Sequence, residues 1–364
     1  MNPDAIYTLA LTYIPKVGPV NQRKLLALAD AKSIWSLSKK EQDEIFRGRK
    51  DILTYLRSSA CLDLAQKELE FCEKNNIEVL LHSSESYPEK LKNCIDSPLV
   101  LFKKGNHEFK SQLYIAIVGT RKMTAYGKNF IDNLVQGLAT HQMTIVSGLA
   151  YGCDIEAHKA SNRNGVPNIA VLAHGLHKVA PAAHQKEARD LQQKGALVSE
   201  YSSFHNPEPI NFVLRNRIIA GICDAVIVVE SDKKGGALAT AQYANAYNRE
   251  VFALPGRIED KYSLGCNALI HNNQACMIRS TDDLLDYFNL KPKPELKPIQ
   301  KELFIHLEPD EKMIYETLSK SGKQQIDQLA VSSGIPTFKL NGLLLNLELK
   351  GIVKPLPGKI FEIK

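Results

Sequence analysis

Glycine, hydroxyl and cationic residues recur where apolar segments of this sequence end. Such a mixture suits phosphate binding, because glycine lets a backbone approach closely while hydroxyl groups and cations complete a nest for an anion. The candidate phosphate-binding residues found in this way are Gly119, Thr120, Arg121, Ser147, Gly148, Lys234, Gly235 and Gly236. A single turn of this kind occurs in many α/β proteins, so the prediction depends on the repetition.

The first of these turns has the most complete pattern. The apolar segment 113–118 predicts a buried strand, and the apolar spacing after Gly127 predicts a helix near 126–141. The turn at Arg121 would then lie at the amino end of that helix, where the partial positive charge of the amides favours an anion. A solvated loop arginine is the simpler alternative. Gly119 and Gly127 are too far apart for the dinucleotide-binding fingerprint.

The segments that follow alternate between strand and helix patterns, which predicts an α/β fold with a Rossmann-like, mostly parallel sheet. The expected core strands cover residues 113–118, 143–147, 168–173, 196–200, 224–230, 250–254 and 276–279. The expected core helices lie near 126–141, 154–163, 184–194, 212–222, 237–247 and 267–273. Ligands of such sheets bind beyond the carboxyl ends of the strands, so the candidate residues should share one surface.

Composition limits the classes of function. The net charge of +6 is spread along the chain, so nucleic-acid binding would need local phosphate contacts and not bulk positive charge. Seven scattered cysteines, none in a Cys-x-x-Cys pair, favour neither a disulfide framework nor a cysteine zinc site. There is no basic and apolar leader and no apolar run of roughly 20 residues. We therefore expect a cytoplasmic protein that does not contact membranes.

Three folded regions and one linker are expected. Residues 1–81 show short helical patterns around a Pro/Gly turn at 14–19, which is typical of a helix-hairpin-helix or SAM-like domain, with a packing hairpin as the alternative. Residues 82–289 carry the core, and the proline- and lysine-rich segment 290–302 predicts a linker. Residues 303–364 have the element order of a winged helix. Its recognition helix is rich in leucine, which favours packing or protein contact over base reading.

Several motifs of the core together resemble those of the DNA-processing protein A (DprA/Smf) family, in that family's order and spacing. They are Val118-Gly-Thr-Arg-Lys-Met-Thr-Ala-Tyr-Gly127, Ser147-Gly-Leu-Ala-Tyr-Gly-Cys-Asp154, Arg215-Asn-Arg-Ile-Ile-Ala-Gly221, Lys234-Gly-Gly-Ala-Leu238 and Val251-Phe-Ala-Leu-Pro-Gly256. The resemblance implies a core that binds single-stranded DNA in natural transformation, protects it, loads the RecA recombinase onto it and forms a homodimer. It also places the family's phosphate pocket on seven of the candidate residues, from Gly119 to Gly235.

Arg215 and Arg217 are further candidates for phosphate binding. Two residues apart on a predicted helix, their side chains point about 200° away from each other, so they cannot share one phosphate. One should reach the phosphate pocket, and the other should pair with Glu200 or Glu230. The sequence does not decide which arginine does which.

Tyr126 and Tyr151 follow the first two core strands and are candidates for stacking on unpaired bases. Stacking would distinguish single strands from duplexes, because duplexes also present phosphates. Packing against the helix behind it is the alternative for each ring.

Other polar residues favour structural roles. His174, His177 and His184 come where this chain departs from the family's pattern, and their spacing matches no compact zinc motif, so one or two surface histidines near a basic site are the better interpretation. Asp154 and His158 are four residues apart at a helix start, where an N-cap role for Asp154 is favoured over general-base chemistry. We expect no metal, cofactor or catalytic residue.

A nucleotide-processing enzyme of the phosphoribohydrolase type is the alternative function. Lys234-Gly-Gly-Ala-Leu-Ala-Thr240 partly imitates the Pro-Gly-Gly-x-Gly-Thr loop of those enzymes. Such an enzyme would also need a catalytic acid and an arginine.

Overall fold

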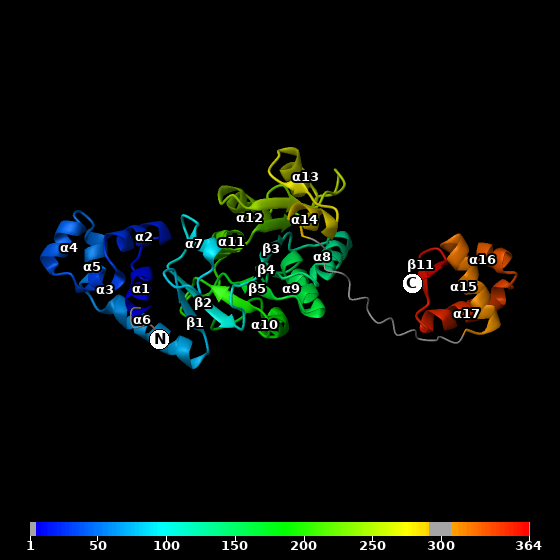
Figure 1. Ribbon diagram of the computed structural model, residues 1–364, viewed down its shortest axis with the longest axis horizontal. Helices are drawn as coiled ribbons and strands as arrows, with labels where there is room; N and C mark the ends of the chain where they lie inside the picture. The colour runs from blue at the N-terminus through cyan, green and yellow to red at the C-terminus, as the bar shows by residue number, and fades with distance from the viewer. Residues whose placement is uncertain (1–4, 291–306, 364) are drawn as a thin grey trace. The chain divides into compact units, whose positions relative to one another are not determined.

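The computed structural model describes residues 5–290 and 307–363. The chain forms two compact units, residues 1–293 and 294–364, each described here by itself (Figure 1). Apart from Leu290, the predicted linker at 290–302 lies outside the described residues.

Nine strands of the first unit form one sheet, in the order β1-β2-β6-β5-β4-β3-β7-β8-β9. Strand β2 runs antiparallel to β1 and β6, and all other neighbours are parallel. The predicted Rossmann-like, mostly parallel sheet is therefore confirmed. The strands are β1 Glu78–Leu81, β2 Val100–Gly105, β3 Leu113–Val118, β4 Met143–Ser147, β5 Asn168–Val171, β6 Ala196–Ser199, β7 Ala225–Val228, β8 Glu250–Ala253 and β9 Cys276–Met277.

Helices cover both faces of this sheet. Successive side chains of a strand point to opposite faces, and both sets are apolar here, so both faces must be covered. On β3, Ile115 and Ile117 join a cluster with α8, α9 and α14, whereas Ala116 and Val118 join another with α11, α12 and α13. The helices of the core are α7 Glu89–Lys92, α8 Ala125–Leu138, α9 Cys153–Asn164, α10 Gln185–Leu191, α11 Pro209–Ile222, α12 Gly236–Ala246, α13 Leu264–His271 and α14 Thr281–Tyr287, with a 3-10 turn at Ala182–His184.

The strand order reverses at β3. From β3 the chain builds β4, β5 and β6 towards one edge, and it then returns to the other side of β3 to form β7. In such sheets the connections that follow the two strands at this reversal lead to opposite sides of the sheet. They leave a crevice for ligands beyond the carboxyl ends of those strands. The ends of β3 and β7 therefore frame the expected site.

Six helices precede the sheet, whereas the apolar patterns near 6–11, 23–28, 52–56 and 62–71 predict four. They are α1 Ala5–Thr12, α2 Pro19–Leu28, α3 Ala31–Ser36, α4 Lys39–Ile45, α5 Lys50–Leu56 and α6 Ala60–Lys74. The two unpredicted helices, α3 and α4, have clear caps, since Asp30 accepts the amide of Ser33 and Ser38 forms a capping box with Glu41. Those capping residues were the available sequence signal.

These helices share a hydrophobic cluster with the first strands of the sheet. Leu9 and Ala65 of the helices belong to the same buried cluster as Leu81 and Phe102. Strand β1 pairs with β2 over its whole length. The division proposed between residues 81 and 82 therefore separates two paired strands, and the sheet begins at residue 78.

The second unit has the element order of a winged helix. It contains α15 Pro309–Ser321, β10 Gln324–Gln325, α16 Ile326–Ser333, α17 Thr337–Leu349, β11 Val353–Leu356 and β12 Ile360–Ile363. Its own core includes Ile314, Leu329 and Leu344. Across both described parts of the chain, no helix combines the length and apolar character needed to cross a membrane.

Candidate nucleic-acid interface

A cavity of about 460 Å³ lies where the strand order reverses. The segment after β3 lines it with Gly119, Thr120, Arg121 and Lys122, and the segment after β7 contributes Ser231, Asp232, Gly235 and Gly236. Helix α11 completes the wall with Phe212, Arg215 and Asn216. Six of the ten predicted phosphate-binding residues therefore meet at one cavity: Gly119, Thr120, Arg121, Arg215, Gly235 and Gly236.

Glycines allow the loops around this cavity to close on one another. A Cβ atom on Gly119 would lie 2.3 Å from the Cys153 sulfur, and one on Gly235 would lie 2.2 Å from the Ser231 hydroxyl oxygen. Gly152 has a φ of +78° and faces the Thr120 carbonyl oxygen, which would be 2.2 Å from an added Cβ. Any larger residue at these positions would have to displace its neighbours.

The mouth of the cavity carries cations that are available to a ligand. Arg121 and Lys122 are exposed, and within residues 5–290 and 307–363 neither forms an ion pair with a carboxylate. Lys261 also lines the cavity and lies 3.4 Å from Asp232. An exposed, unpaired guanidinium has its planar donor fork free for phosphate oxygens.

An aromatic ring lies between the two arginines of the cavity. The centroid of Phe212 is 5.7 Å from Cζ of Arg121 and 6.0 Å from Cζ of Arg215. Phe212 was not among the residues predicted from the sequence, although its spacing to Arg215, Asn216 and Ile219 places all four on one face of a helix. Lys122 and Lys261 were not predicted either, and the sequence offered no signal for Lys261.

Arg215 forms the floor of the cavity and not its mouth. Its Nη1 donates to the carbonyl oxygens of Gly148, at 2.9 Å, and Val171, which joins the ends of β4 and β5. Burial lowers the pKa of Arg215 to about 10, so the guanidinium stays charged at neutral pH. An anion above this floor would be attracted by a buried positive charge in a medium of low dielectric constant.

Asp154 lies beside Arg215 and orders the loop after β4. Its Oδ2 accepts the amides of Gly148 at 3.1 Å and Ala150 at 3.4 Å. Burial raises the pKa of the Asp154 carboxyl, and the Arg215 guanidinium opposes that shift. The predicted N-cap role is wrong, because Gly152 is the N-cap of α9 and Asp154 lies inside the helix.

Ser147 and Gly148 support the cavity from beneath and do not line it. The buried Ser147 hydroxyl donates to the Ile117 carbonyl at 2.6 Å, which fastens β4 to β3. A Cβ atom on Gly148 would lie 2.6 Å from both Arg215 Nη2 and Asp154 Oδ2. Their assignment to direct phosphate contact is corrected accordingly: both residues shape the floor.

The amino end of α8, where the sequence suggested a phosphate cradle, already holds a carboxylate. Buried Glu230 accepts the amide of Thr124 at 2.8 Å and its hydroxyl at 2.5 Å. By contrast, α12 begins at Gly236 after an N-cap glycine, Gly235, and no side chain caps it. The helix end that offers amides to an anion in this cavity is therefore that of α12.

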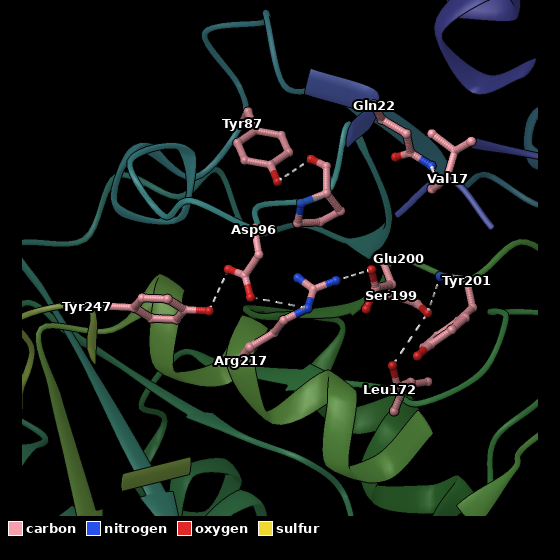
Figure 2. A network of polar contacts seen from close by, with 11 residues as sticks. Val17, Gln22, Tyr87, Asp96, Leu172, Ser199, Glu200, Tyr201, Arg217 and Tyr247 are labelled. Carbon is pink, nitrogen blue, oxygen red and sulfur yellow. Dashed lines mark hydrogen bonds and ion pairs between the residues drawn. The ribbon is translucent and has the colours of Figure 1, made fainter. Parts of the chain in front are cut away.

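Arg217 lies in a separate buried network, shown in Figure 2. Its guanidinium pairs with Glu200 and lies 3.9 Å from Asp96, which in turn accepts the Tyr247 hydroxyl at 2.5 Å. Burial raises the pKa of the Glu200 carboxyl, and the Arg217 guanidinium opposes that shift. Arg217 is therefore removed from the candidate phosphate contacts: Arg215 reaches the cavity, and Arg217 pairs with Glu200.

Tyr126, Tyr151 and Lys234 lie outside this cavity. Tyr126 lines a neighbouring cavity of about 760 Å³ that shares Lys261 and Tyr262 with the first, and its hydroxyl donates to the Pro255 carbonyl at 2.8 Å. The Tyr151 ring lies edge-on to His184 at 4.7 Å. Both tyrosine rings are about half exposed, and Lys234 is exposed beside Gly235.

Of the three histidines expected near the surface, His177 is exposed, whereas His174 and His184 are buried and hydrogen-bonded to backbone carbonyls. His184 contacts the Leu149 carbonyl and His158 contacts the Asn168 side chain, each at 2.8 Å. In the part of the chain that the structure describes, no three His, Cys, Asp or Glu side chains are grouped as a metal site would require.

The fold and cavity define a Rossmann-like protein with a cationic, aromatic site and an appended winged helix. The family model described as DNA recombination-mediator protein A matches residues 78–289, and the DprA winged helix domain matches residues 300–359. The chain therefore belongs to the DprA/Smf family.

Known members of the family resemble much of the chain. Protein Smf of Escherichia coli is 35% identical over 324 residues, which are 86% of this chain and 85% of that protein. The DNA processing protein DprA of Streptococcus pneumoniae is 38% identical over 204 residues, 56% of this chain and 72% of its own.

Solved structures of the family confirm the fold. DprA from Streptococcus pneumoniae aligns with a TM-score of 0.62 and 30% identity, over 79% of this chain and 98% of that one. DprA from Helicobacter pylori, described for its single-stranded DNA binding mode, aligns with a TM-score of 0.53 and 29% identity, over 58% of this chain and 95% of that one.

Proposed function

We propose that this protein is a single-stranded DNA-binding recombination mediator and not an enzyme. The observation that carries the proposal is the cavity beyond β3 and β7, which Arg121 and Lys122 line without a carboxylate partner among the described residues. Arg121 lies over Phe212 there, and Arg215 supplies a buried charge. Cations hold a DNA backbone, and an aromatic ring that is at least partly exposed, as that of Phe212 is, can stack on unpaired bases. The described DNA binding of the Helicobacter pylori relative supports this proposal.

The strand would run across both neighbouring cavities. One phosphate would lie between Arg121 and the amides at the start of α12, with its base on Phe212. The next nucleotides would pass Lys261 and Tyr262, which line both cavities, towards Tyr126. Lys234 would bind a phosphate at the rim of the first cavity, and Tyr151 remains a second candidate for stacking.

Binding to a short labelled strand, measured by fluorescence anisotropy at several salt concentrations, tests this proposal. We expect a preference for the single strand over its duplex, and a logarithm of affinity that falls with the logarithm of salt by about 0.7 per phosphate bound. A flat salt dependence contradicts the phosphate contacts. Equal affinity for the duplex contradicts the stacking.

A phosphoribohydrolase-like activity is the second candidate, because an acid and an arginine, Asp154 and Arg215, both line the cavity. Both side chains are engaged, however, in holding the backbone of the loop after β4. We expect no release of base from nucleoside monophosphates, measured by chromatography after prolonged incubation. Release that is abolished by Asp154→Asn would favour the enzyme instead.

Membership of the DprA/Smf family supports a wider role as a proposal. We propose that the protein acts in the cytoplasm as a homodimer that protects incoming strands and helps load RecA. The test is the rate of RecA filament formation on single strands covered by single-strand-binding protein, which should rise when this protein is added. An unchanged rate would restrict the function to DNA binding.

A further inference from the structure

The exposed face of α17 is apolar, although it is the face that a winged helix would turn to DNA. Phe338, Leu345 and Leu349 are 83%, 56% and 79% exposed. With Gly342 they repeat at intervals of four, three and four residues, which is a heptad seam along one side of the helix. The buried side chains of α17 are Leu340, Leu344 and Leu347. At 100° per residue, the exposed seam lies opposite that core.

The cations beside this seam are already paired. Lys339 Nζ lies 2.6 Å from Asp310 Oδ2, and Lys350 Nζ lies 2.5 Å from Glu311 Oε2. Phosphate binding would have to break these pairs, and an exposed leucine and phenylalanine offer little to base edges. The surface therefore favours an apolar partner.

Nothing among the described residues accounts for a glycine at position 342. It lies inside α17, where glycine is the least favourable residue after proline. A Cβ atom at this position would meet no atom of the described residues within 4 Å, so neither their packing nor a positive φ requires glycine there. A small residue in the middle of an exposed apolar seam makes room for a side chain that comes from outside.

We propose that α17 pairs antiparallel with α17 of a second copy of this chain. In that register, centred between residues 343 and 344, Leu345 fills the space above the partner's Gly342 and Phe338 packs on the partner's Leu349. Each contact occurs twice, as the two-fold symmetry of an isologous interface demands. Large residues face small ones at the centre, and two large residues meet at each end.

The polar residues beside the seam fit the same register. Asn341 and Glu348 lie along one side of the seam, and Lys339 and Asn346 lie along the other. In an antiparallel pair, each side of one helix meets the same side of the other. Glu348 then faces the partner's Asn341, whose amide can donate to the carboxylate, and Lys339 faces the partner's Asn346, whose carbonyl can accept. The asparagines thus match both charges without placing two carboxylates together. This interface is independent of DNA binding and of the proposed core dimer.

Cross-linking of the full chain tests the register. The background is Cys276→Ser, which removes the one cysteine that is exposed. Residues 338 of the two copies would be roughly 16 Å apart along the axis, whereas 338 and the partner's 349 would be adjacent. Under mild oxidation, Phe338→Cys alone and Leu349→Cys alone should stay uncross-linked, and an equal mixture should form a covalent dimer. Cross-linking of Phe338→Cys alone, or no cross-linking of the mixture, overturns the proposal.

Two substitutions separate pairing from folding. Gly342→Leu and Leu345→Lys should each lower the cross-linking yield more than about tenfold, because they fill the required space or place a charge in the seam. Both sites are exposed, so thermal unfolding should change little. Val331→Lys, on α16 and 85% exposed, is the matched control and should cross-link like the parent. Equal cross-linking yields in all three variants overturn the antiparallel pair. This outcome does not depend on how tightly the variants bind DNA.

Discussion

The core cavity and the exposed face of α17 both occupy positions where their folds usually bind ligands, yet they present opposite surfaces. At the cavity, Arg121 and Lys122 are exposed without a carboxylate partner within the described residues, and Phe212 lies beside them. On α17, Lys339 and Lys350 are both paired, and the exposed side chains are apolar. Whether a cation is paired, and not how many cations a segment carries, decides what each surface can bind.

The largest expected effect concerns an arginine of the core that is not available to DNA. Arg217→Ala should lower the free energy of unfolding by about 3–5 kcal/mol, because it leaves Glu200 buried without its partner. Urea unfolding measures this loss. The folded variant should bind single strands like the parent. Adding Glu200→Gln to Arg217→Ala should recover part of the lost stability, because it removes the unpaired carboxylate. Full stability together with weakened DNA binding would return Arg217 to the DNA-binding residues.

Acid should weaken the core without involving the cavity. Burial lowers the pKa of His107 and of His158 from 6.5 to about 4. Between pH 4 and pH 6.5 the unfolded chain therefore binds more protons than the folded chain. The stability that the neutral, buried histidines contribute is complete above pH 6.5 and is lost as pH falls towards 4. For His158 the loss is on the order of 3 kcal/mol. Unfolding curves at several pH values should show it, and His158→Gln should flatten the dependence. An unchanged pH profile in His158→Gln contradicts this assignment.

Removing the ring from the cavity should weaken single-strand binding selectively. Phe212→Leu should cost about 1–3 kcal/mol of binding free energy, whereas Phe212→Tyr should retain most of it, because both aromatic rings can stack on a base. Phe204→Leu is the control, since Phe204 is half exposed but lies outside the cavity. Equal anisotropy titrations for the parent and Phe212→Leu would exclude stacking at this site.

The smallest effects should come from the two tyrosines. Tyr126→Leu and Tyr151→Leu should each weaken single-strand binding by about 1 kcal/mol or less if the ring stacks at the edge of the site. Tyr126→Phe should retain binding, although it removes the hydrogen bond to the Pro255 carbonyl. If both leucine variants bind like the parent, or lose thermal stability in step with binding, neither tyrosine stacks on DNA.

The sequence predicted the sheet and most of the cavity because both depend on local patterns. Apolar runs mark the strands, and Gly119, Thr120 and Arg121 follow one of them directly. The misassignments concern partners that are distant in the chain. Glu230, which follows another strand, accepts a hydrogen bond at the amino end of α8, and Glu200 forms an ion pair with Arg217. No local pattern of the sequence could reveal the first pairing. For the second, the sequence named Glu200 as a possible partner but did not show that Arg217, and not Arg215, would be the arginine that pairs with it.

On α17, the leucine content and the few cations predicted packing or protein contact, but they gave no partner. The added information is three-dimensional: which leucines are exposed, and that Asp310 and Glu311 neutralise the lysines. Phe212 is the reverse case. The sequence shows that Phe212 lies three residues before Arg215, and this helical spacing is enough to predict that both side chains lie on the same face of α11.

The most direct test of the account compares how charge removal at the two surfaces changes the salt dependence of single-strand affinity. Arg121→Ala and Lys122→Ala should each weaken binding and reduce the slope of log affinity against log salt, by about 0.7 for each phosphate that is no longer bound. Arg189→Ala, an exposed arginine outside the cavity, should change neither, and the double variant Lys339→Ala/Lys350→Ala should leave the slope unchanged. A slope that falls in the α17 double variant and stays constant in the two cavity variants would contradict the account.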